Sequence, residues 1–147
     1  MPMLLTGTHD RTLDEKKRLA LPRKVRQAMR NPKLVFVTPA PDQCLWVYTQ
    51  QGLETLAARL DASPATDAEA RVFRRLYFAQ TESVDLDGMG RILIPDRLYQ
   101  FALLEKEVVL LGVRDHLEIW DQRRWQEYLA NHGPRFDSVA ERAFPGN

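Results

Sequence analysis

An internal repeat is the feature of this sequence that most restricts its fold. Residues 13–22 read LDEKKRLALP and residues 86–95 read LDGMGRILIP, so that Leu, Asp, Arg and Pro recur in the same order 73 positions apart. The three residues between the arginine and the proline are apolar in both copies. A second apolar stretch, residues 34–37, has its counterpart at residues 108–111. Because the order of elements is shared over most of both halves, the chain consists of two related units in tandem.

The repeat predicts the same secondary structure in each half. Residues 18–21 and 91–94 are short, apolar and partly β-branched, which is typical of strands. A proline follows each of these strands and favours a short helix, over residues 22–29 in the first half and 95–102 in the second. Two further strands joined by a turn are expected to follow in each half.

Amphipathic patterns predict a longer helix at the end of each copy and another helix between the copies. Apolar residues recur at helical spacing over residues 53–60 and 125–132. Between them, Thr66 and Glu69 form the pattern of a capping box and predict a helix that begins there. The sequence after His132 shows little periodicity, so we expect a poorly ordered or loosely packed tail. The expected divisions are a first repeat (1–62), a connecting helix (63–78), a second repeat (79–132) and the tail (133–147).

The composition is that of a globular protein without a membrane segment. Hydrophobic residues make up 44% and charged residues 28% of the 147 residues, close to the average of soluble domains. No apolar stretch approaches the roughly 20 residues of a spanning helix, and the first residues lack the basic region of a signal peptide. We therefore expect a cytoplasmic protein that does not contact a membrane.

Neither a metal, nor a cofactor, nor a small-molecule substrate is expected. The single cysteine, Cys44, excludes an internal disulfide and a cysteine-based zinc site. His9, His116 and His132 lie in three different expected elements and lack the spacing of metal ligands. The Gly-Met-Gly stretch at residues 88–90 lacks the remainder of a nucleotide-binding motif.

Charge is distributed unevenly along the chain. Residues 1–78 carry 13 basic and 8 acidic side chains, a formal charge of +5, whereas residues 79–147 carry 8 and 12, a formal charge of −4. Within residues 10–33, nine basic side chains oppose three acidic ones. A basic stretch of this density is suited to facing phosphates, and it is equally typical of a solvated surface.

Each copy also contains a short charged loop that precedes the Arg-x-x-x-Pro strand. Asp14 opens the first loop and Arg18 closes it, and Asp87 and Arg91 do the same in the second loop. In a structural interpretation, the aspartate accepts the loop's own backbone N–H groups and pairs with the arginine. In a functional interpretation, the aspartate holds the guanidinium as a rigid fork for guanine or phosphate. The residues alone leave both interpretations open.

The sequence resembles the MraZ family of bacterial regulators from Met3 to His132. The most specific features are Leu-Asp-x-x-x-Arg-Leu-x-Leu-Pro near the start and Asp-Gly-Met-Gly-Arg-Ile-Leu-Ile-Pro past the middle. The expected helix over residues 68–76 and the strand that ends at residues 117–121 also fit the family. The resemblance implies an α+β fold in which two tandem AbrB-like, SpoVT-type repeats form one swapped-hairpin β-barrel with flanking helices.

The resemblance also implies a function. Members of the family are sequence-specific DNA-binding regulators, usually repressors, of the division and cell-wall gene cluster. They form ring-shaped homo-oligomers, associate with the nucleoid and bind G-rich direct repeats upstream of their own operon. In the family the Asp-x-x-x-Arg loops face double-stranded DNA. This implies that Arg18 and Arg91 are DNA-binding residues, that Asp14 and Asp87 support them, and that Lys16 stands where the family commonly has lysine.

One position departs from the family pattern. Lys17 precedes the first motif arginine, where the family usually has glycine, as at Gly90 of the second copy. If this position needs a positive φ, lysine costs about 1 kcal/mol or forces another turn. Together with Lys16, Lys17 is expected to attract phosphate. We therefore expect the first copy to contribute more to DNA affinity than the second, in which carboxylates surround the arginine.

Two other classes of function remain open. One is an AbrB-like antitoxin or interaction module that binds a partner protein, although such antitoxins are usually a single module with a long disordered tail. The other is a small acid–base enzyme that uses Asp85 and Asp87, for which the sequence offers no further active-site motif. We therefore expect a DNA-binding protein and not an enzyme.

Overall fold

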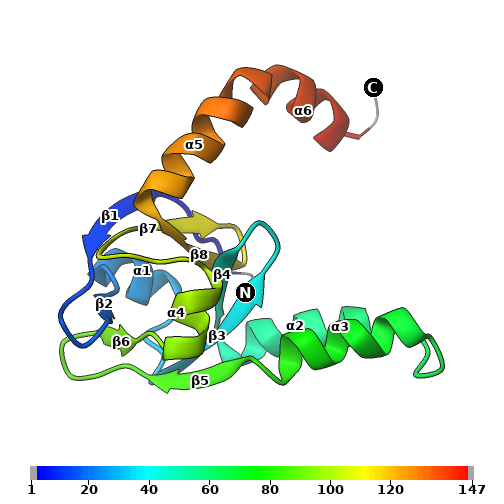
Figure 1. Ribbon diagram of the computed structural model, residues 1–147, viewed down its shortest axis with the longest axis horizontal. Coiled ribbons are helices and arrows are strands. Elements are labelled where there is room, and N and C mark those ends of the chain that lie inside the picture. Colours follow the sequence, from blue (N-terminus) through cyan, green and yellow to red (C-terminus); the bar gives the residue numbers. More distant parts are fainter. Residues whose placement is uncertain (1–2, 146–147) are drawn as a thin grey trace.

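The computed structural model describes residues 3–145 and shows a mixed α+β protein, as the sequence predicts (Figure 1). In each half, two short strands, a short helix, a β-hairpin and a longer helix follow one another. The strands are β1 (Thr8–Thr12), β2 (Arg18–Ala20), β3 (Leu34–Ala40), β4 (Cys44–Tyr48), β5 (Glu82–Asp85), β6 (Arg91–Leu93), β7 (Glu107–Val113) and β8 (His116–Asp121). The helices are α1 (Arg23–Ala28), α2 (Gln50–Leu60), α3 (Ala68–Phe78), α4 (Asp96–Phe101), α5 (Gln122–His132) and α6 (Phe136–Ala143).

The two repeats build one antiparallel sheet rather than two. Its strand order is β1-β7-β8-β4-β3-β5, and β2 and β6 form a separate two-stranded ribbon. β1 of the first repeat pairs with β7 of the second, and β5 of the second repeat pairs with β3 of the first. The two hairpins meet where β4 pairs with β8. Each repeat therefore depends on the other for the strand at the edge of its hairpin.

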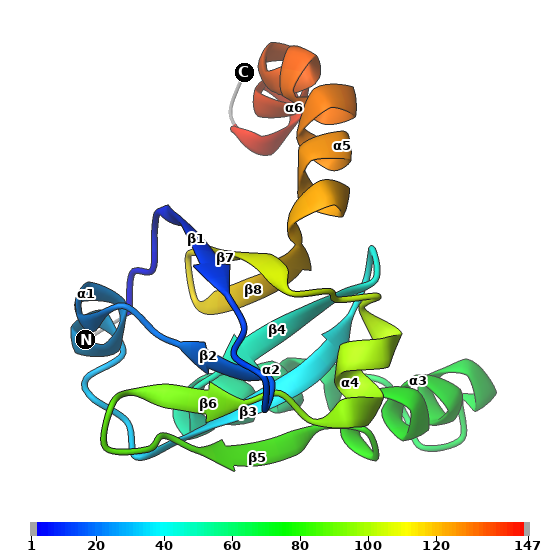
Figure 2. The same ribbon diagram turned by 60° about the vertical axis from the view of Figure 1, so that its left-hand side comes forward.

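The expectation of a closed β-barrel is wrong. β1 and β5 are the two ends of the six-stranded sheet, and within residues 3–145 they do not pair with each other. The ribbon does not close the gap, because each of its strands has only three residues. Each strand is followed within two residues by a proline, Pro22 or Pro95, which has no N–H group to extend the ladder. The sheet is therefore open, and the ribbon lies over one of its faces (Figure 2).

The main core lies between the sheet and the ribbon. Leu19 and Ile92, the central residues of β2 and β6, pair with each other and are both 0% exposed. They belong to one hydrophobic cluster with Val47 and Leu117 of the sheet and Leu98 of α4. Burial of each such side chain stabilises the fold by about 1.5–3 kcal/mol. The core thus holds the ribbon in place, and with it the charged loops that lead into β2 and β6.

Two helical extensions project from this body in different directions (Figures 1 and 2). α2 and α3 form one extension, and α5 and α6 form the other. In these four helices, as far as the structure describes them, Tyr77 alone is buried. Of the helices between residues 3 and 145, none has the length and hydropathy needed to cross a membrane.

The cap of α3 differs from expectation. Asp67 caps this helix and Thr66 does not, because the Asp67 carboxylate accepts hydrogen bonds from the backbone N–H groups of Glu69 and Ala70, at 3.0 and 3.2 Å. The helix therefore begins one residue later than the capping-box pattern predicts. α5 is capped in the same way, since the Asp121 side chain accepts a hydrogen bond from the backbone N–H of Arg124 at 3.4 Å.

Of the two expectations for the tail, poor order is wrong and loose packing is confirmed. A 3-10 turn over Gly133–Arg135 leads into α6. Phe136, Val139, Ala140 and Ala143 recur at i, i+3, i+4 and i+7, so a helical pattern is present in the sequence. The helix is nevertheless exposed along most of its surface.

Candidate nucleic-acid interface

The first charged loop, residues 14–18, is organised by its own aspartate. The Oδ1 atom of Asp14 accepts hydrogen bonds from the backbone N–H groups of Lys16 and Arg18, at 3.0 and 2.8 Å. Its Oδ2 atom lies 2.6 Å from Nε of Arg18. The backbone N–H of Lys17 donates to the Asp14 carbonyl at 2.9 Å and closes the turn. These hydrogen bonds, foremost the one from the Arg18 backbone, hold the pKa of Asp14 below its usual value, so the carboxylate stays ionised and orients the guanidinium.

The second loop, residues 87–91, repeats this geometry. The Oδ1 atom of Asp87 accepts from the backbone N–H groups of Met89 and Arg91, both at 2.9 Å. Its Oδ2 atom lies 2.8 Å from Nε of Arg91. The backbone N–H of Gly90 donates to the Asp87 carbonyl at 2.9 Å. The hydrogen bond from the Arg91 backbone again contributes most to a lowered pKa, here that of Asp87.

Both loops place the residue before the arginine in the left-handed region. The φ angle is 64° at Lys17 and 75° at Gly90, so the lysine does not give the first loop another shape. This conformation costs a lysine about 1 kcal/mol relative to glycine. The side chain offsets part of that cost, because Nζ of Lys17 lies 2.7 Å from Oδ1 of Asp96 and 4.4 Å from the centroid of the Tyr99 ring. Lys17 therefore contacts α4 rather than standing free at the loop.

A different cation fills the corresponding space beside the second loop. A Cβ atom on Gly90 would lie 2.6 Å from Nε of Arg26, a residue of α1. The same Nε donates to the carbonyl of Leu21 at 3.1 Å, which holds the guanidinium there. The cation beside each loop thus has a different source: it belongs to the loop in the first copy and to the neighbouring helix in the second.

The β2–β6 ribbon brings the two loops together. Its register pairs Arg18 with Leu93 and Ala20 with Arg91 on the outward face, while the central pair is buried. The two guanidinium groups meet around Asp14, whose Oδ2 lies 2.6 Å from Nε of Arg18 and 3.9 Å from Nη1 of Arg91. Arginines from both repeats therefore share one carboxylate at the centre of this face.

Both loops reach the same side of the molecule, away from the α2–α3 extension (Figure 1). Lys16 is exposed on the first loop, as is Met89 on the second. The two aspartates and two arginines predicted as a site are brought together, whereas the charge of Lys17 is directed to α4. A two-stranded ribbon fits the major groove of duplex DNA, and a fixed arginine fork matches guanine.

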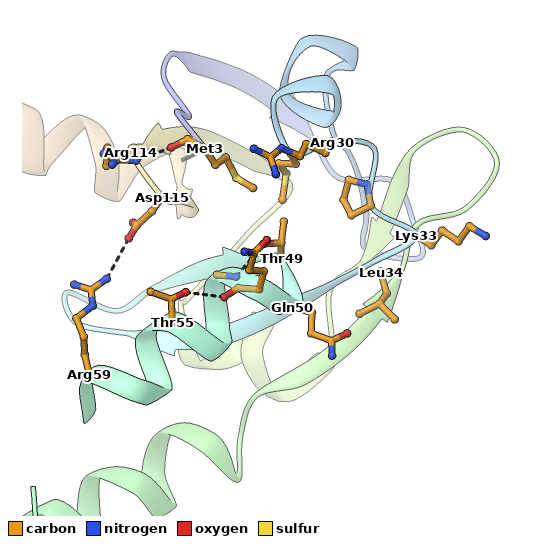
Figure 3. A pocket seen from close by; sticks show the side chains of 14 residues that line it. Met3, Arg30, Lys33, Leu34, Thr49, Gln50, Thr55, Arg59, Arg114 and Asp115 are labelled. Carbon is orange, nitrogen blue, oxygen red and sulfur yellow. Dashed lines mark hydrogen bonds and ion pairs between the residues drawn. The ribbon is translucent and has the colours of Figure 1, made fainter. Parts of the chain in front are cut away.

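A basic cavity that the sequence does not predict lies between the α1–β3 connection, the start of α2 and the β7–β8 turn (Figure 3). Its volume is about 580 Å³. Arg30, Arg59 and Arg114 lie on its wall, where Arg59 pairs with Asp115 at 3.5 Å. Thr49 caps the first turn of α2 beside the cavity. Because these residues are far apart in the sequence, no local pattern marks the cavity.

A hydrogen-bonded network around His116 on β8 is also absent from the sequence-based predictions. Nδ1 of His116 lies 2.8 Å from Oδ1 of Asp115, and its Nε2 lies 3.0 Å from Oε2 of Glu118. Trp120 donates from Nε1 to Oε1 of Glu118 at 2.9 Å. Burial lowers the pKa of His116, but the bonds to Glu118 and Asp115 outweigh it and raise this pKa above its usual value. Across residues 3–145, no group of three or more His, Cys, Asp or Glu side chains is arranged to hold a metal ion.

The fold and the loops define a class of protein in which two tandem α+β repeats share one sheet and each contribute an Asp–Arg loop to a common ribbon. The family model described as "MraZ protein, putative antitoxin-like" matches the chain twice, over residues 4–76 and 77–146. The chain belongs to the MraZ family, as the resemblance of its two motifs predicts.

Relatives named Transcriptional regulator MraZ are similar to nearly the whole chain. The protein of Moorella thermoacetica is 37% identical over 139 residues, 95% of this chain and 96% of the relative. That of Saccharopolyspora erythraea is 38% identical over 143 residues, 97% of this chain and 99% of the relative. That of Lactiplantibacillus plantarum is 37% identical over 135 residues, 92% of this chain and 94% of the relative. The similarity therefore extends over both repeats.

Proposed function

We propose that this chain is a sequence-specific DNA-binding transcriptional regulator that reads duplex DNA through the β2–β6 ribbon and its two loops. The observation that carries the proposal is the pair of guanidinium groups of Arg18 and Arg91. They come from different repeats and lie 2.6 and 3.9 Å from the same oxygen of Asp14. The names of relatives that are similar over their full length, which are transcriptional regulators, support the same function.

The loops prepare the arginines for base recognition. Asp14 and Asp87 hold the Nε atoms of their arginines at 2.6 and 2.8 Å, which fixes each guanidinium plane. The terminal Nη groups would bind DNA, for which Nη1 of Arg91 must leave its 3.9 Å contact with Asp14. A guanidinium held in this way forms two hydrogen bonds to O6 and N7 of guanine. Lys16 attracts phosphate, and Lys17 joins it when DNA competes with Asp96.

The family resemblance extends the proposal to the genes under control. The target is a set of G-rich direct repeats upstream of the chain's own operon, within the division and cell-wall gene cluster. Binding there represses transcription, and the protein acts in the cytoplasm at the nucleoid. The support is the match of both loop motifs, in each of which an aspartate orients an arginine through its Nε. A guanidinium oriented in this way suits a guanine edge.

The two repeats form a single functional unit. The division into repeats 1–62 and 79–132, with a connecting helix over 63–78 and a tail over 133–147, follows the order of elements. The pairing of β1 with β7 and of β5 with β3 supports a description in which the repeats have exchanged strands, as swapped hairpins do. Neither repeat presents the ribbon alone, because each contributes one of its strands.

A ring-shaped homo-oligomer completes the proposal. Large apolar side chains are exposed along both helical extensions, and exposed apolar surface favours contact with another protein surface. Several copies in a ring would place many loops on repeated DNA sites and raise their effective concentration there. The exposed apolar residues of α3, α5 and α6 are Val72, Phe73, Leu76, Leu129, Phe136 and Val139.

A protein partner is the second candidate function. The description of the family model includes the term antitoxin-like, and the exposed Phe136 and Val139 of α6 would suit a partner's groove. The interaction module would then use the α5–α6 extension rather than the ribbon. Substitution of Phe136 by Ser would abolish partner binding in that case and leave the DNA contacts of a single subunit intact.

The acid–base enzyme is less well supported. Both oxygens of Asp87 are engaged within the loop, and the pKa of Asp87 is lowered by those bonds. A general acid needs the opposite shift. Asp85 lies on β5 opposite Leu34 and shares no hydrogen bond with Asp87 in the part of the chain that the structure describes.

Binding of the purified protein to the DNA upstream of its own gene tests the proposed function. The comparison is with a scrambled probe of equal length, at two salt concentrations, for the unchanged protein and for Arg18→Ala and Arg91→Ala. We expect preference for the natural probe, weakened by about 1–3 kcal/mol in each variant. Arg59→Ala serves as the control for the loss of one positive charge, because Arg59 lies on the wall of the basic cavity and outside the ribbon. Equal, weak and salt-sensitive binding to both probes would contradict the proposal.

A further inference from the structure

The outward face of the ribbon has two similar arginines but dissimilar neighbours. Arg18 lies directly opposite Leu93, and Arg91 lies directly opposite Ala20. Ala20 and Leu93 occupy equivalent positions in the two repeats, two residues after the motif arginine. Leu93 is 51% exposed, although the residues on either side of it, Ile92 and Ile94, are buried. The outward face of the ribbon therefore carries a large apolar side chain, Leu93, beside Arg18 and only a methyl group, that of Ala20, beside Arg91.

The geometry points to Leu93 as a residue that reads thymine in the major groove, next to the base that Arg18 contacts. The inference rests on the proposed function and adds a specificity that the arginines do not supply. Directly opposed residues of an antiparallel pair have Cβ atoms about 4.5–5.5 Å apart. Arg18 and Leu93 therefore address the same base pair or adjacent ones, since successive bases are about 3.4 Å apart.

The chemistry of the groove selects the ligand for this side chain. Leucine forms no hydrogen bonds, so a favourable contact requires an apolar group. In the major groove that group is the C5-methyl of thymine, because the other base edges present hydrogen-bond donors and acceptors. The Arg18–Leu93 end of the ribbon thus reads guanine with a neighbouring thymine, whereas the Arg91–Ala20 end reads guanine with a weaker apolar contact. The two strands of the ribbon are related by approximate two-fold symmetry, and this difference between its ends would give the protein one preferred orientation on DNA.

Deoxyuridine provides the test, because it keeps every hydrogen-bonding group of thymine and lacks only the methyl group. Two probes carry the DNA upstream of the gene, one with thymine and one with deoxyuridine throughout. Dissociation constants are measured for the unchanged protein, Leu93→Ala and Leu103→Ala. Leu103 is a matched control, since it is 53% exposed and lies outside the ribbon.

We expect the unchanged protein to bind the deoxyuridine probe about fourfold more weakly for each methyl group contacted. Leu93→Ala should lose a similar factor on the thymine probe and then bind both probes equally. Leu103→Ala should behave as the unchanged protein. The reverse variant, Ala20→Leu, should show a larger difference between the probes than the unchanged protein does. All four proteins are compared at the same salt concentration, since phosphate contacts are common to both probes.

Two results would overturn the inference. One is equal binding of both probes by the unchanged protein. The other is a difference between the probes that persists in Leu93→Ala, because the methyl groups would then act through another residue or through DNA shape. A failure of the proposed function looks different, since the thymine probe would then lose its advantage over a scrambled probe and Arg18→Ala would have no effect.

Discussion

The two charged loops have the same geometry but different neighbouring residues. In both, an aspartate accepts two backbone N–H groups and one arginine Nε, and the residue before the arginine has a positive φ. Lys17 reaches Asp96 and Tyr99 from the first loop, whereas Arg26 fills the space beside Gly90 at the second. The aspartate therefore sets the loop geometry, and the glycine of the family pattern is not required for it.

The surroundings predict unequal roles for the arginines. Arg91 lies 2.8 Å from Asp87 and 3.9 Å from Asp14, so in the proposed complex two carboxylates would compete with DNA for its donors. The first loop also carries the exposed Lys16, where the second carries Met89. We therefore propose that the first copy contributes more affinity and the second more of the ribbon's framework.

The largest expected effect is on the free energy of unfolding, and it shows whether β2 and β6 contribute equally to the core. Leu19→Ala and Ile92→Ala should each lower the free energy of unfolding by about 2–5 kcal/mol, because both residues are fully buried in one cluster. Urea denaturation measures this, with the exposed Leu103→Ala expected within about 0.5 kcal/mol of the unchanged protein. A cost confined to one of the two strands would show that the ribbon is not a joint structure.

The second prediction compares the arginines directly. Arg18→Ala and Arg91→Ala should each weaken binding to the natural DNA by about 1–3 kcal/mol, with the larger loss from Arg18→Ala. Equilibrium titration of a labelled probe measures both losses. The idea that the first copy dominates would be abandoned if Arg91→Ala caused the larger loss.

The third prediction concerns substitutions at the position that differs between the loops, Lys17 in the first and Gly90 in the second. Gly90→Ala should destabilise the protein by about 1–2 kcal/mol through its positive φ, and by more if Arg26 cannot move away from the new Cβ. Lys17→Gly should change stability by less than about 1 kcal/mol, because relief at φ offsets the loss of a half-exposed ion pair. Thermal or urea unfolding measures both.

A double substitution separates the two causes at Gly90. Arg26→Ala combined with Gly90→Ala should remove the steric part of the cost and leave the part due to φ. If the cost of Gly90→Ala were unchanged in the Arg26→Ala background, Arg26 would not fill the space beside the second loop in solution.

The smallest expected effect concerns Cys44 and His116, the first residues of β4 and β8. The pKa of His116 is raised by Glu118 and Asp115 against the effect of burial. Its contribution to stability is therefore complete below the unfolded pKa of about 6.5 and is lost as the pH rises through the folded pKa. The free energy of unfolding should fall between pH 6 and pH 8, and His116→Gln should reduce this fall.

Cys44 provides the contrast for this measurement. Burial raises the pKa of its thiol, so it affects stability only as the pH approaches the ordinary cysteine value of about 8.5. His9, whose pKa is lowered chiefly by burial, acts in the opposite direction: stability rises as the pH approaches the unfolded pKa of about 6.5 and then stays constant. The same slope with pH in the His116→Gln variant as in the unchanged protein would contradict the role of the network.

Local signals in the sequence predict the repeat, the short strands and the Asp–Arg loops, because a turn aspartate bonds to backbone only two and four residues away. Contacts between distant residues are not predictable in this way. The register of Arg18 against Leu93 and the pairing of Lys17 with Asp96 depend on how two halves of the chain meet. The open form of the sheet also depends on how the two halves of the chain pack against each other.

Binding to DNA that contains 7-deazaguanine tests whether arginines from both repeats read guanine edges through a shared ribbon. The natural DNA is prepared with 7-deazaguanine, which lacks the N7 acceptor that a bidentate arginine requires. The unchanged protein should bind this DNA about tenfold or more weakly than the natural DNA, corresponding to at least about 1.4 kcal/mol. The double variant Arg18→Ala/Arg91→Ala should bind modified and natural DNA equally. Equal binding of both DNAs by the unchanged protein would contradict base reading by the arginines.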